Sequence, residues 1–155
     1  MESERLLFRE IELSDTQFIV DIRSAPEVYR YFISPHKITI EEHIDWFQNN
    51  YCLSKDRIDY IAVEKTSNSS VGVFGIIITG DRVEINYIVQ KEFQNRGFGR
   101  EGVICLLNYA RNELHCVTAV AEIHQDNTPS LALAKGLGFT KVSGNGKILR
   151  FEKRL

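Results

Sequence analysis

A glycine-rich segment is the first candidate for chemistry in this sequence. Residues 94–102 read QNRGFGREG and contain three glycines with the spacing G-x-G-x-x-G, which are Gly97, Gly99 and Gly102. Glycines let backbone N–H groups converge on an anion, and a following helix adds the positive end of its dipole. Arg96 and Arg100 flank the segment and are candidates for further positive charge. The segment therefore predicts a site for a pyrophosphate group.

The same spacing is the fingerprint of NAD-binding Rossmann domains, and this alternative stays open. A Rossmann unit places the first glycine almost directly after a strand, with an acidic residue about 20 positions further on. Glu122 has a suitable position for that acid. However, residues 90–96 separate the preceding predicted strand from Gly97, and the strands upstream are predicted to be antiparallel. We therefore interpret Gly102 as a small residue in the first turns of a helix.

A second polar segment follows at residues 127–139, which read NTPSLALAKGLGF. Asn127 has the position of a helix N-cap, and Pro129 lies in the first turn of the predicted helix, where its missing N–H costs little.

Together the two segments resemble the GNAT N-acetyltransferase superfamily. The acetyl-CoA loop of that family has the form (Gln/Arg)-x-x-Gly-x-(Gly/Ala) directly after a strand. Its second segment has the form N-x-x-(Ser/Ala) before a helix that ends in Gly-Phe. The residues that match these two forms are Gln94, Gly97, Gly99, Asn127, Ser130, Gly138 and Phe139.

The resemblance implies that acetyl-CoA is the cosubstrate. The backbone at Ile88 and Val89 would run beside the pantetheine arm, in a strand that splays from its neighbour. The amides of residues 95–100 would hold the pyrophosphate, and Asn127 would hydrogen-bond the CoA arm with Ser130 close by. The implied cofactor-binding residues are Ile88, Val89, Gln94, Asn95, Arg96, Gly97, Phe98, Gly99, Arg100, Asn127 and Ser130.

Acetyl transfer to an amine also requires a base, because a primary alkylamine is mostly protonated at neutral pH. Glu84 is the candidate, since it is the carboxylate on the predicted strand that leads to the loop and it alternates with Val83 and Ile85. A backbone N–H near Ile88 is expected to meet the oxyanion. We expect direct attack in a ternary complex, without an acyl-enzyme.

The general acid departs from the family pattern. Many members have a tyrosine seven positions after the asparagine, where this sequence has Ala134. The ribosomal-protein N-terminal acetyltransferase branch lacks that tyrosine and keeps a serine, so Ser130 is the expected acid, with Tyr87 and Tyr109 as alternatives. Ala134 also favours a second hypothesis, a CoA-binding regulatory domain without turnover.

The acceptor is expected to bind in residues 22–47, where basic and aromatic residues alternate. The stretches PEVYRYF and ITIEEHIDWF in this region resemble both the ribosomal-protein branch and the nucleotide-amino-sugar N-acetyltransferases. A nucleotide amino sugar and a protein N-terminus are therefore both open as acceptors.

These residues need a scaffold of strands and helices, which the hydrophobic periodicity predicts. The expected strands are 5–13, 58–65, 71–79, 82–90, 116–123 and a hairpin at 139–155, and the expected helices are 16–24, 26–32, 38–50, 98–114 and 128–138. Three consecutive strands joined by tight turns predict an antiparallel meander. We expect residues 1–155 to form one α+β domain of the GNAT fold, with a mixed, mostly antiparallel sheet flanked by helices.

Composition limits the partners. The chain has 155 residues, a hydrophobic fraction of 43% and a formal net charge of −2. This charge gives no general attraction to nucleic acid or to an anionic membrane, and no apolar run approaches the roughly 20 residues of a membrane span. The three cysteines lack the spacing of zinc ligands, so no metal is expected. We expect a cytoplasmic protein with a small-molecule or peptide amine as partner, and a homodimer is left open.

Overall fold

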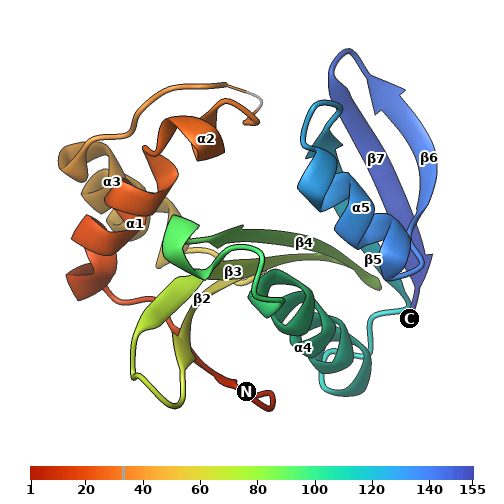
Figure 1. The fold of residues 1–155 in the computed structure, drawn as a ribbon, viewed down its shortest axis with the longest axis horizontal. Helices are drawn as coiled ribbons and strands as arrows, with labels where there is room; N and C mark the ends of the chain where they lie inside the picture. Colours follow the sequence, from red (N-terminus) through yellow and green to blue (C-terminus); the bar gives the residue numbers. More distant parts are fainter. Residues whose placement is uncertain (33) are drawn as a thin grey trace.

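One seven-stranded sheet organises the chain (Figure 1). It is seen in a computed structural model that describes residues 1–32 and 34–155, so Ile33 of the expected acceptor region lies outside the described residues. The strands are β1 (Leu6–Glu10), β2 (Arg57–Glu64), β3 (Ser70–Thr79), β4 (Arg82–Val89), β5 (Thr118–His124), β6 (Thr140–Asn145) and β7 (Ile148–Arg154). The helices are α1 (Thr16–Arg23), α2 (Pro26–Tyr29), α3 (Ile40–Trp46), α4 (Phe98–Asn112) and α5 (Thr128–Gly136), with short helical turns η1 (Leu13–Asp15), η2 (Phe47–Tyr51) and η3 (Lys91–Phe93).

The strand order is β1-β2-β3-β4-β5-β7-β6, and within the described residues only β4 and β5 are parallel neighbours. The predicted meander of β2, β3 and β4 is confirmed, as is the mixed, mostly antiparallel sheet. The sheet is not a doubly wound parallel sheet, so the Rossmann alternative is wrong.

The first strand is shorter than the predicted 5–13, because Asp15 turns the chain early. β1 ends at Glu10, and the Asp15 carboxylate accepts a hydrogen bond from the backbone N–H of Glu12 at 2.8 Å. The same carboxylate is paired with both terminal nitrogens of Arg9, at 2.6 and 2.8 Å. Asp15 occupies the N-cap position of α1 but makes no side-chain cap bond there.

The third helix begins two residues later than the predicted start at residue 38 and then changes its winding. The Thr39 hydroxyl accepts a hydrogen bond from the Glu42 N–H at 3.1 Å, which begins α3 at Ile40. After Trp46 the chain continues through Tyr51 as a π-helical turn rather than as the α-helix predicted to 50.

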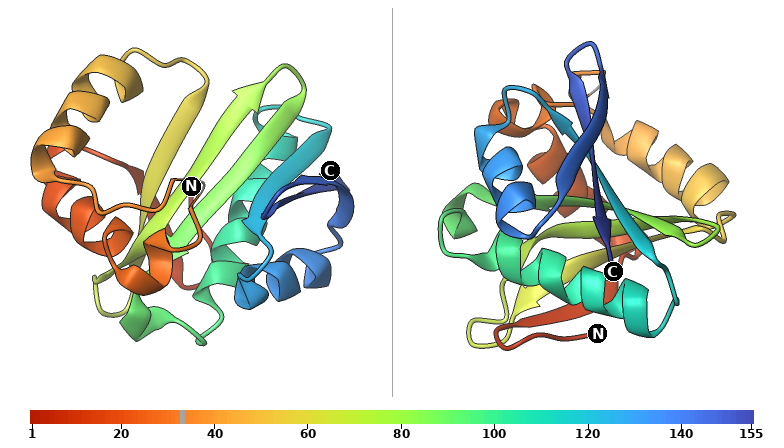
Figure 2. Two further views of the ribbon diagram at one scale, coloured as in Figure 1. Left: turned by 90° about the horizontal axis from the view of Figure 1, so that it is seen from above. Right: turned by 90° about the vertical axis from the view of Figure 1, so that its right-hand side faces the viewer.

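Helices cover both faces of the sheet (Figures 1 and 2). Helix α4 packs against β3 and β4 over the larger core, where a Cβ at Gly102 would lie 2.2 Å from the Phe74 ring. Gly102 therefore allows α4 to approach the sheet closely. On the other face, Ile19 of α1 meets Ile61 of β2, with Trp46 packed beside them. This second face, which we call the α1 face, becomes important below.

Strands β4 and β5 separate soon after they pair. Only Arg82–Glu84 of β4 is in register with Thr118–Val120 of β5. Beyond Glu84, β4 remains paired with β3 and β5 remains paired with β7, so the two strands diverge (Figure 1). The expected splayed strand pair is thus present, and it opens toward the glycine loop that follows β4.

Among the helices of the described residues, none is long and apolar enough to span a membrane.

Candidate functional site

The glycine loop forms a cradle of backbone donors at the end of β4. Gly97 has φ +84° and Asn95 has φ +59°, which turn the chain sharply into α4. After Gln94, the next backbone N–H that donates a hydrogen bond is that of Glu101, which bonds the Gly97 carbonyl at 3.0 Å. Within the described residues, no hydrogen bond uses the six amides of residues 95–100. They are the unsatisfied donors of a helix N-terminus together with the turn before it.

The side chain of Gln94 closes this loop onto the strand. Its Nε2 donates to the carbonyl oxygen of Val89 at 2.9 Å. Gln94 therefore fixes the loop against the end of β4 through its own side chain, which is a positioning role.

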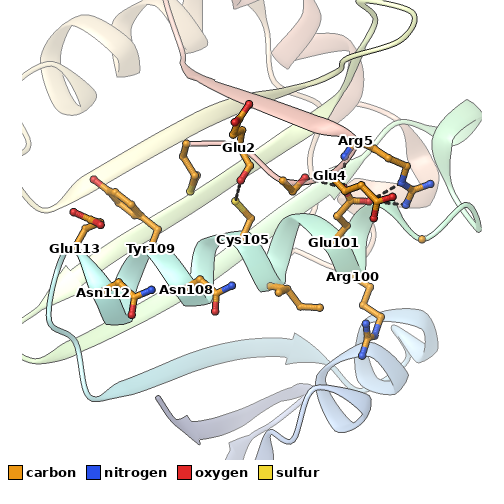
Figure 3. Close-up of a pocket in the computed structure, with 14 residues that line it drawn as sticks. Glu2, Glu4, Arg5, Arg100, Glu101, Cys105, Asn108, Tyr109, Asn112 and Glu113 are labelled. Carbon is orange, nitrogen blue, oxygen red and sulfur yellow. Dashed lines mark hydrogen bonds and ion pairs between the residues drawn. The ribbon is translucent and has the colours of Figure 1, made fainter.

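The two arginines of the loop differ. The guanidinium of Arg96 lies 3.5 Å from the Glu64 carboxylate and 5.2 Å from the ring centres of Phe93 and Phe98, so groups of the protein already contact its charge. Arg100 is exposed, and Figure 3 shows it extending from α4 toward the side on which α5 lies. Arg100 is therefore the better candidate for contact with a bound anion.

Sequence reasoning missed a brace beneath the loop. Glu101 accepts hydrogen bonds from the Ser3 hydroxyl at 2.7 Å, the Arg5 N–H at 2.8 Å and the Arg5 Nε at 2.7 Å (Figure 3). Arg5 in turn donates to the Arg96 carbonyl at 3.1 Å and lies 4.2 Å from the centre of the Phe98 ring. The Arg5–Glu101 brace joins the chain start to the loop over a separation of 96 residues, so no local pattern could reveal it.

Two hollows lie near this region. A groove of about 810 Å³ runs between the chain start and α4, from Gly97 to Glu113 (Figure 3). A smaller hollow of about 210 Å³ lies between the α1–α2 segment and the end of β4, and it includes Val89 and Gln94. The free amides and the diverging strands place the candidate site at the end of β4, where the smaller hollow reaches Val89 and Gln94 and the larger groove reaches Gly97 and Arg100.

The strand register changes the candidate for the oxyanion contact. The N–H of Gln90 donates to the Val71 carbonyl at 2.9 Å, so the backbone of Gln90 faces β3. In an antiparallel pair, every second residue directs its N–H and C=O toward the partner strand. Ile88, two residues before Gln90, therefore also directs its N–H and C=O toward β3. A Cβ at Gly72 would lie 2.1 Å from the Ile88 oxygen, which agrees. The amides that face the diverging side belong to Tyr87 and Val89. The candidate N–H near Ile88 is therefore that of Tyr87 or Val89 rather than that of Ile88 itself.

Glu84 lies on the α1 face, at the last position where β4 and β5 pair. Its side chain is half-buried, and burial together with the nearby charge of Glu122 raises its pKa, while Arg150 and Arg57 oppose the shift. A raised pKa makes a carboxylate a stronger base, which is the property that proton abstraction from an ammonium requires.

Asn127 and Ser130 begin α5, on the opposite side of the sheet opening. The Asn127 side chain accepts a hydrogen bond from the Ser130 N–H at 3.3 Å, so it caps the helix. The Ser130 hydroxyl lies 3.1 Å from the Tyr87 hydroxyl. Burial raises the pKa of Tyr87, and the bond with Ser130 lowers it in part.

The other residues considered for the general acid are not joined to this pair. Ala134 is buried with 3% of its surface exposed and offers no proton. Tyr109 lies near the far end of α4 (Figure 3), where its ring centre is 6.4 Å from that of Tyr60. The structure therefore brings Tyr87 and Ser130 together and leaves Tyr109 apart.

Some side chains of the expected acceptor region, residues 22–47, are buried and others are exposed to solvent. Arg23, His43 and Trp46 turn toward the α1 face, where His43 stacks on Trp46 with ring centres 5.4 Å apart. Arg30, His36 and Lys37 are exposed. Only part of the basic and aromatic alternation thus points toward the candidate site.

Comparison with known proteins agrees with this geometry. The chain is 27% identical to the uncharacterized N-acetyltransferase p20 of Bacillus licheniformis over 156 residues, which cover 97% of this chain and 86% of that protein. A solved domain from Methanocaldococcus jannaschii superposes with a TM-score of 0.86 at 26% identity, covering 99% of this chain and 100% of that one. Spermidine N-acetyltransferase from Vibrio cholerae superposes with a TM-score of 0.85 at 18% identity, covering 97% and 95%.

The solved structures show that the fold is shared, and the sequence match to a family model shows in addition which family the chain belongs to. Residues 5–140 match the family described as acetyltransferase (GNAT) domain, which includes the diverging strands, the glycine loop and the start of α5. The chain therefore belongs to the GNAT acetyltransferase family and is an N-acetyltransferase.

Proposed function

We propose that residues 1–155 act as one domain that transfers an acetyl group from acetyl-CoA to the primary amine of a small molecule or peptide, by direct attack in a ternary complex. One observation carries the proposal. A loop with six free backbone amides follows a strand that diverges from its neighbour directly beyond a half-buried carboxylate, Glu84. The base and the open strand edge thus lie on β4, and the loop amides that can bind an anion follow directly after it.

The pyrophosphate of CoA fits the free amides of residues 95–100, with Arg100 as the side chain able to reach it. The pantetheine arm would lie along β4, where the backbone groups of Tyr87 and the N–H of Val89 offer it hydrogen bonds; the Val89 carbonyl is already bonded by Gln94. Asn127 would serve from the α5 side, although its side chain also caps the helix. In this arrangement the thioester lies between Glu84 and Ser130.

Glu84 accepts a proton from the acceptor ammonium, directly or through water, and the freed nitrogen lone pair attacks the thioester carbonyl carbon. The amide of Tyr87 or Val89 stabilises the resulting oxyanion. The C–S bond then breaks, and the leaving thiolate takes a proton from the Ser130 hydroxyl, which Tyr87 can resupply across their 3.1 Å contact. The products are the acetylated amine and CoA.

Two observations bear on the chemical class of the acceptor: the sequence resemblance and a solved structural neighbour. The sequence resemblance suggests a nucleotide amino sugar or a protein N-terminus. The Vibrio cholerae neighbour was solved with CoA and spermine, which supports a small-molecule amine in a fold of this kind. The hypothesis of a regulatory domain without turnover rested on Ala134, and the N-acetyltransferase family of this chain favours turnover instead.

The test separates CoA binding from turnover. Calorimetry measures CoA binding by the wild type, and thiol release from acetyl-CoA is followed with a panel of primary amines. We expect Glu84→Gln to bind CoA normally and to lose about 100-fold or more in kcat. The control is Glu113→Gln, which changes an exposed carboxylate at the end of α4 and should leave both unchanged. CoA binding without thiol release for any amine would favour the regulatory domain, and full activity in Glu84→Gln would remove Glu84 as the base.

A further inference from the structure

Three buried polar atoms without hydrogen-bond partners occur in the described part of the chain, and they mark a region outside the acetyl-transfer machinery. They are Arg23 Nε, His43 Nε2 and Asp59 Oδ1. The ionisation of His43 responds to the charges of both Arg23 and Asp59, so the three side chains are neighbours. All three lie on the α1 face, where Glu84 also lies.

The sheet supplies one half of this region. In the cross-strand register, Arg57 shares a row with Glu84, and Asp59 shares the next row with Gly75 and Asn86. A Cβ at Gly75 would lie 2.1 Å from Asp59 Oδ1 and 2.6 Å from Asn86 Oδ1. The glycine therefore gives these two polar groups room to meet above β3.

Arg57 is held in a fixed position. Its Nε donates to Asp59 Oδ2 at 2.8 Å, and its guanidinium lies 5.1 Å from the Trp46 ring centre. Since Asp59 is 3% exposed, this ion pair is shielded from water on the carboxylate side.

The helices supply Arg23, the last residue of α1. Its guanidinium lies 5.3 Å from the Phe32 ring centre, and burial, aided by the charge of Arg57, lowers its pKa, with Asp59 opposing. Within the described residues, Arg23 makes no ion pair. The region therefore holds two guanidinium groups and the buried carboxylate of Asp59, which is already paired with Arg57. Glu84 lies half-buried in the row of Arg57, and the buried Asp15, which acts on His43, is paired with Arg9. We call Arg23, Arg57, Asp59 and Asn86 the arginine cluster.

A half-buried guanidinium without an anion is costly, and a planar guanidinium fork matches a carboxylate or phosphate in shape and charge. His43 carries no negative charge that could compensate Arg23; burial and the charge of Arg23 lower the pKa of its imidazole. Arg57 and Glu84 lie two strands apart in one row, so their Cα atoms are separated by about 10 Å. An anion at the cluster would thus lie a short spacer away from an amine at Glu84.

We propose that Arg23 and Arg57 bind an anionic group, a carboxylate or a phosphate, on the amine acceptor. This inference rests on the proposed function and specifies its substrate class: an amine that carries a negative charge, rather than a polyamine. A second ammonium group in place of the anion would face two guanidinium groups and be repelled.

The experiment compares acceptors matched in length. Wild-type kcat/KM is measured for a series of ω-amino carboxylates, for aminoalkyl phosphates, for alkylamines of equal length and for spermidine. We expect the anionic acceptors to exceed the alkylamines by about 10- to 100-fold at the best spacer length. In Arg23→Gln this ratio should fall toward one. Arg111→Gln, which changes an exposed arginine in the last turn of α4, should keep the wild-type ratio. The carboxylate and phosphate series distinguish the two sources of charge.

Direct binding supplies a second measurement that does not need turnover. Inorganic phosphate is titrated into the wild type and Arg23→Gln by calorimetry, and the melting temperature of each variant verifies folding. The wild type should bind phosphate at least tenfold more tightly than Arg23→Gln. Alkylamines or spermidine used as well as anionic acceptors would overturn the inference while leaving acetyl transfer intact. If no amine is acetylated, the proposed function fails, and equal phosphate binding by the two proteins would then overturn the inference as well.

Discussion

Replacing Arg5 with methionine should weaken CoA binding from a position that does not reach the ligand. Methionine keeps an apolar stem beside the Phe98 ring but removes the hydrogen bonds from Arg5 Nε to Glu101 and from Arg5 Nη1 to the Arg96 carbonyl. The backbone N–H of Arg5 and the Ser3 hydroxyl still bond Glu101, so the chain start stays docked. The substitution therefore loosens the loop selectively.

The magnitude follows from exposure. The Arg5 side chain is 42% exposed and that of Glu101 is 17% exposed, so solvent screening reduces the ion pair. We expect a loss of about 1–2 kcal/mol in the free energy of unfolding, which lowers the melting temperature by about 2–8 °C. If about 1 kcal/mol of this had held the loop amides in place, the Kd for CoA rises about fivefold.

The matched control lies at the other end of β1. Arg9 is 44% exposed and is paired with Asp15, which is 10% exposed, but it does not touch the loop. Arg9→Met should destabilise the fold by a similar amount and leave the Kd for CoA unchanged. Calorimetry gives the Kd and urea unfolding gives the stability. An equal change in Kd for both variants, or none for either, would refute the bracing role of Arg5.

Three further expectations concern packing and pH. Gly102→Ala should cost about 1–3 kcal/mol in urea unfolding because its Cβ would lie 2.2 Å from the Phe74 ring, whereas Gly136→Ala, with no atom within 4 Å, should be neutral or stabilising. Because the pKa of Glu84 is raised from 4.5, kcat/KM should fall with decreasing pH at values above the ordinary glutamate range. Glu122→Gln removes the like charge and should move this fall to lower pH; an unmoved profile would assign it to another group.

Local patterns were enough to predict the elements of this fold. Alternation predicted β2, β3 and β4 within a few residues, and helical spacing predicted the start of α3 within two residues. The end of β1 was not predictable in this way, because the Arg9–Asp15 pair that turns the chain depends on where two side chains meet. The glycine loop was recognisable because its chemistry needs particular residues at fixed spacing.

Features that depend on register or on distant contacts could not be predicted. The sequence does not show whether the amide of Tyr87 or that of Ile88 faces β5. Only the register of β3 with β4 decides this. Asp59 and Asn86 lie over Gly75 because the three residues share one row across three strands. The arginine cluster combines such a row with Arg23 from a helix, so neighbouring residues in the sequence carry no sign of it.

The early separation of β4 and β5 places two unsatisfied strand edges inside a sheet rather than at its rim. Strand edges pair readily with any extended backbone, which makes exposed ones a hazard for aggregation. Here the two edges converge at Glu84, the last residue of β4 that pairs with β5. A cosubstrate arm with amide groups is able to bond such edges. Binding of the cosubstrate between the two strands would then pair backbone groups that the fold alone leaves without partners in the sheet.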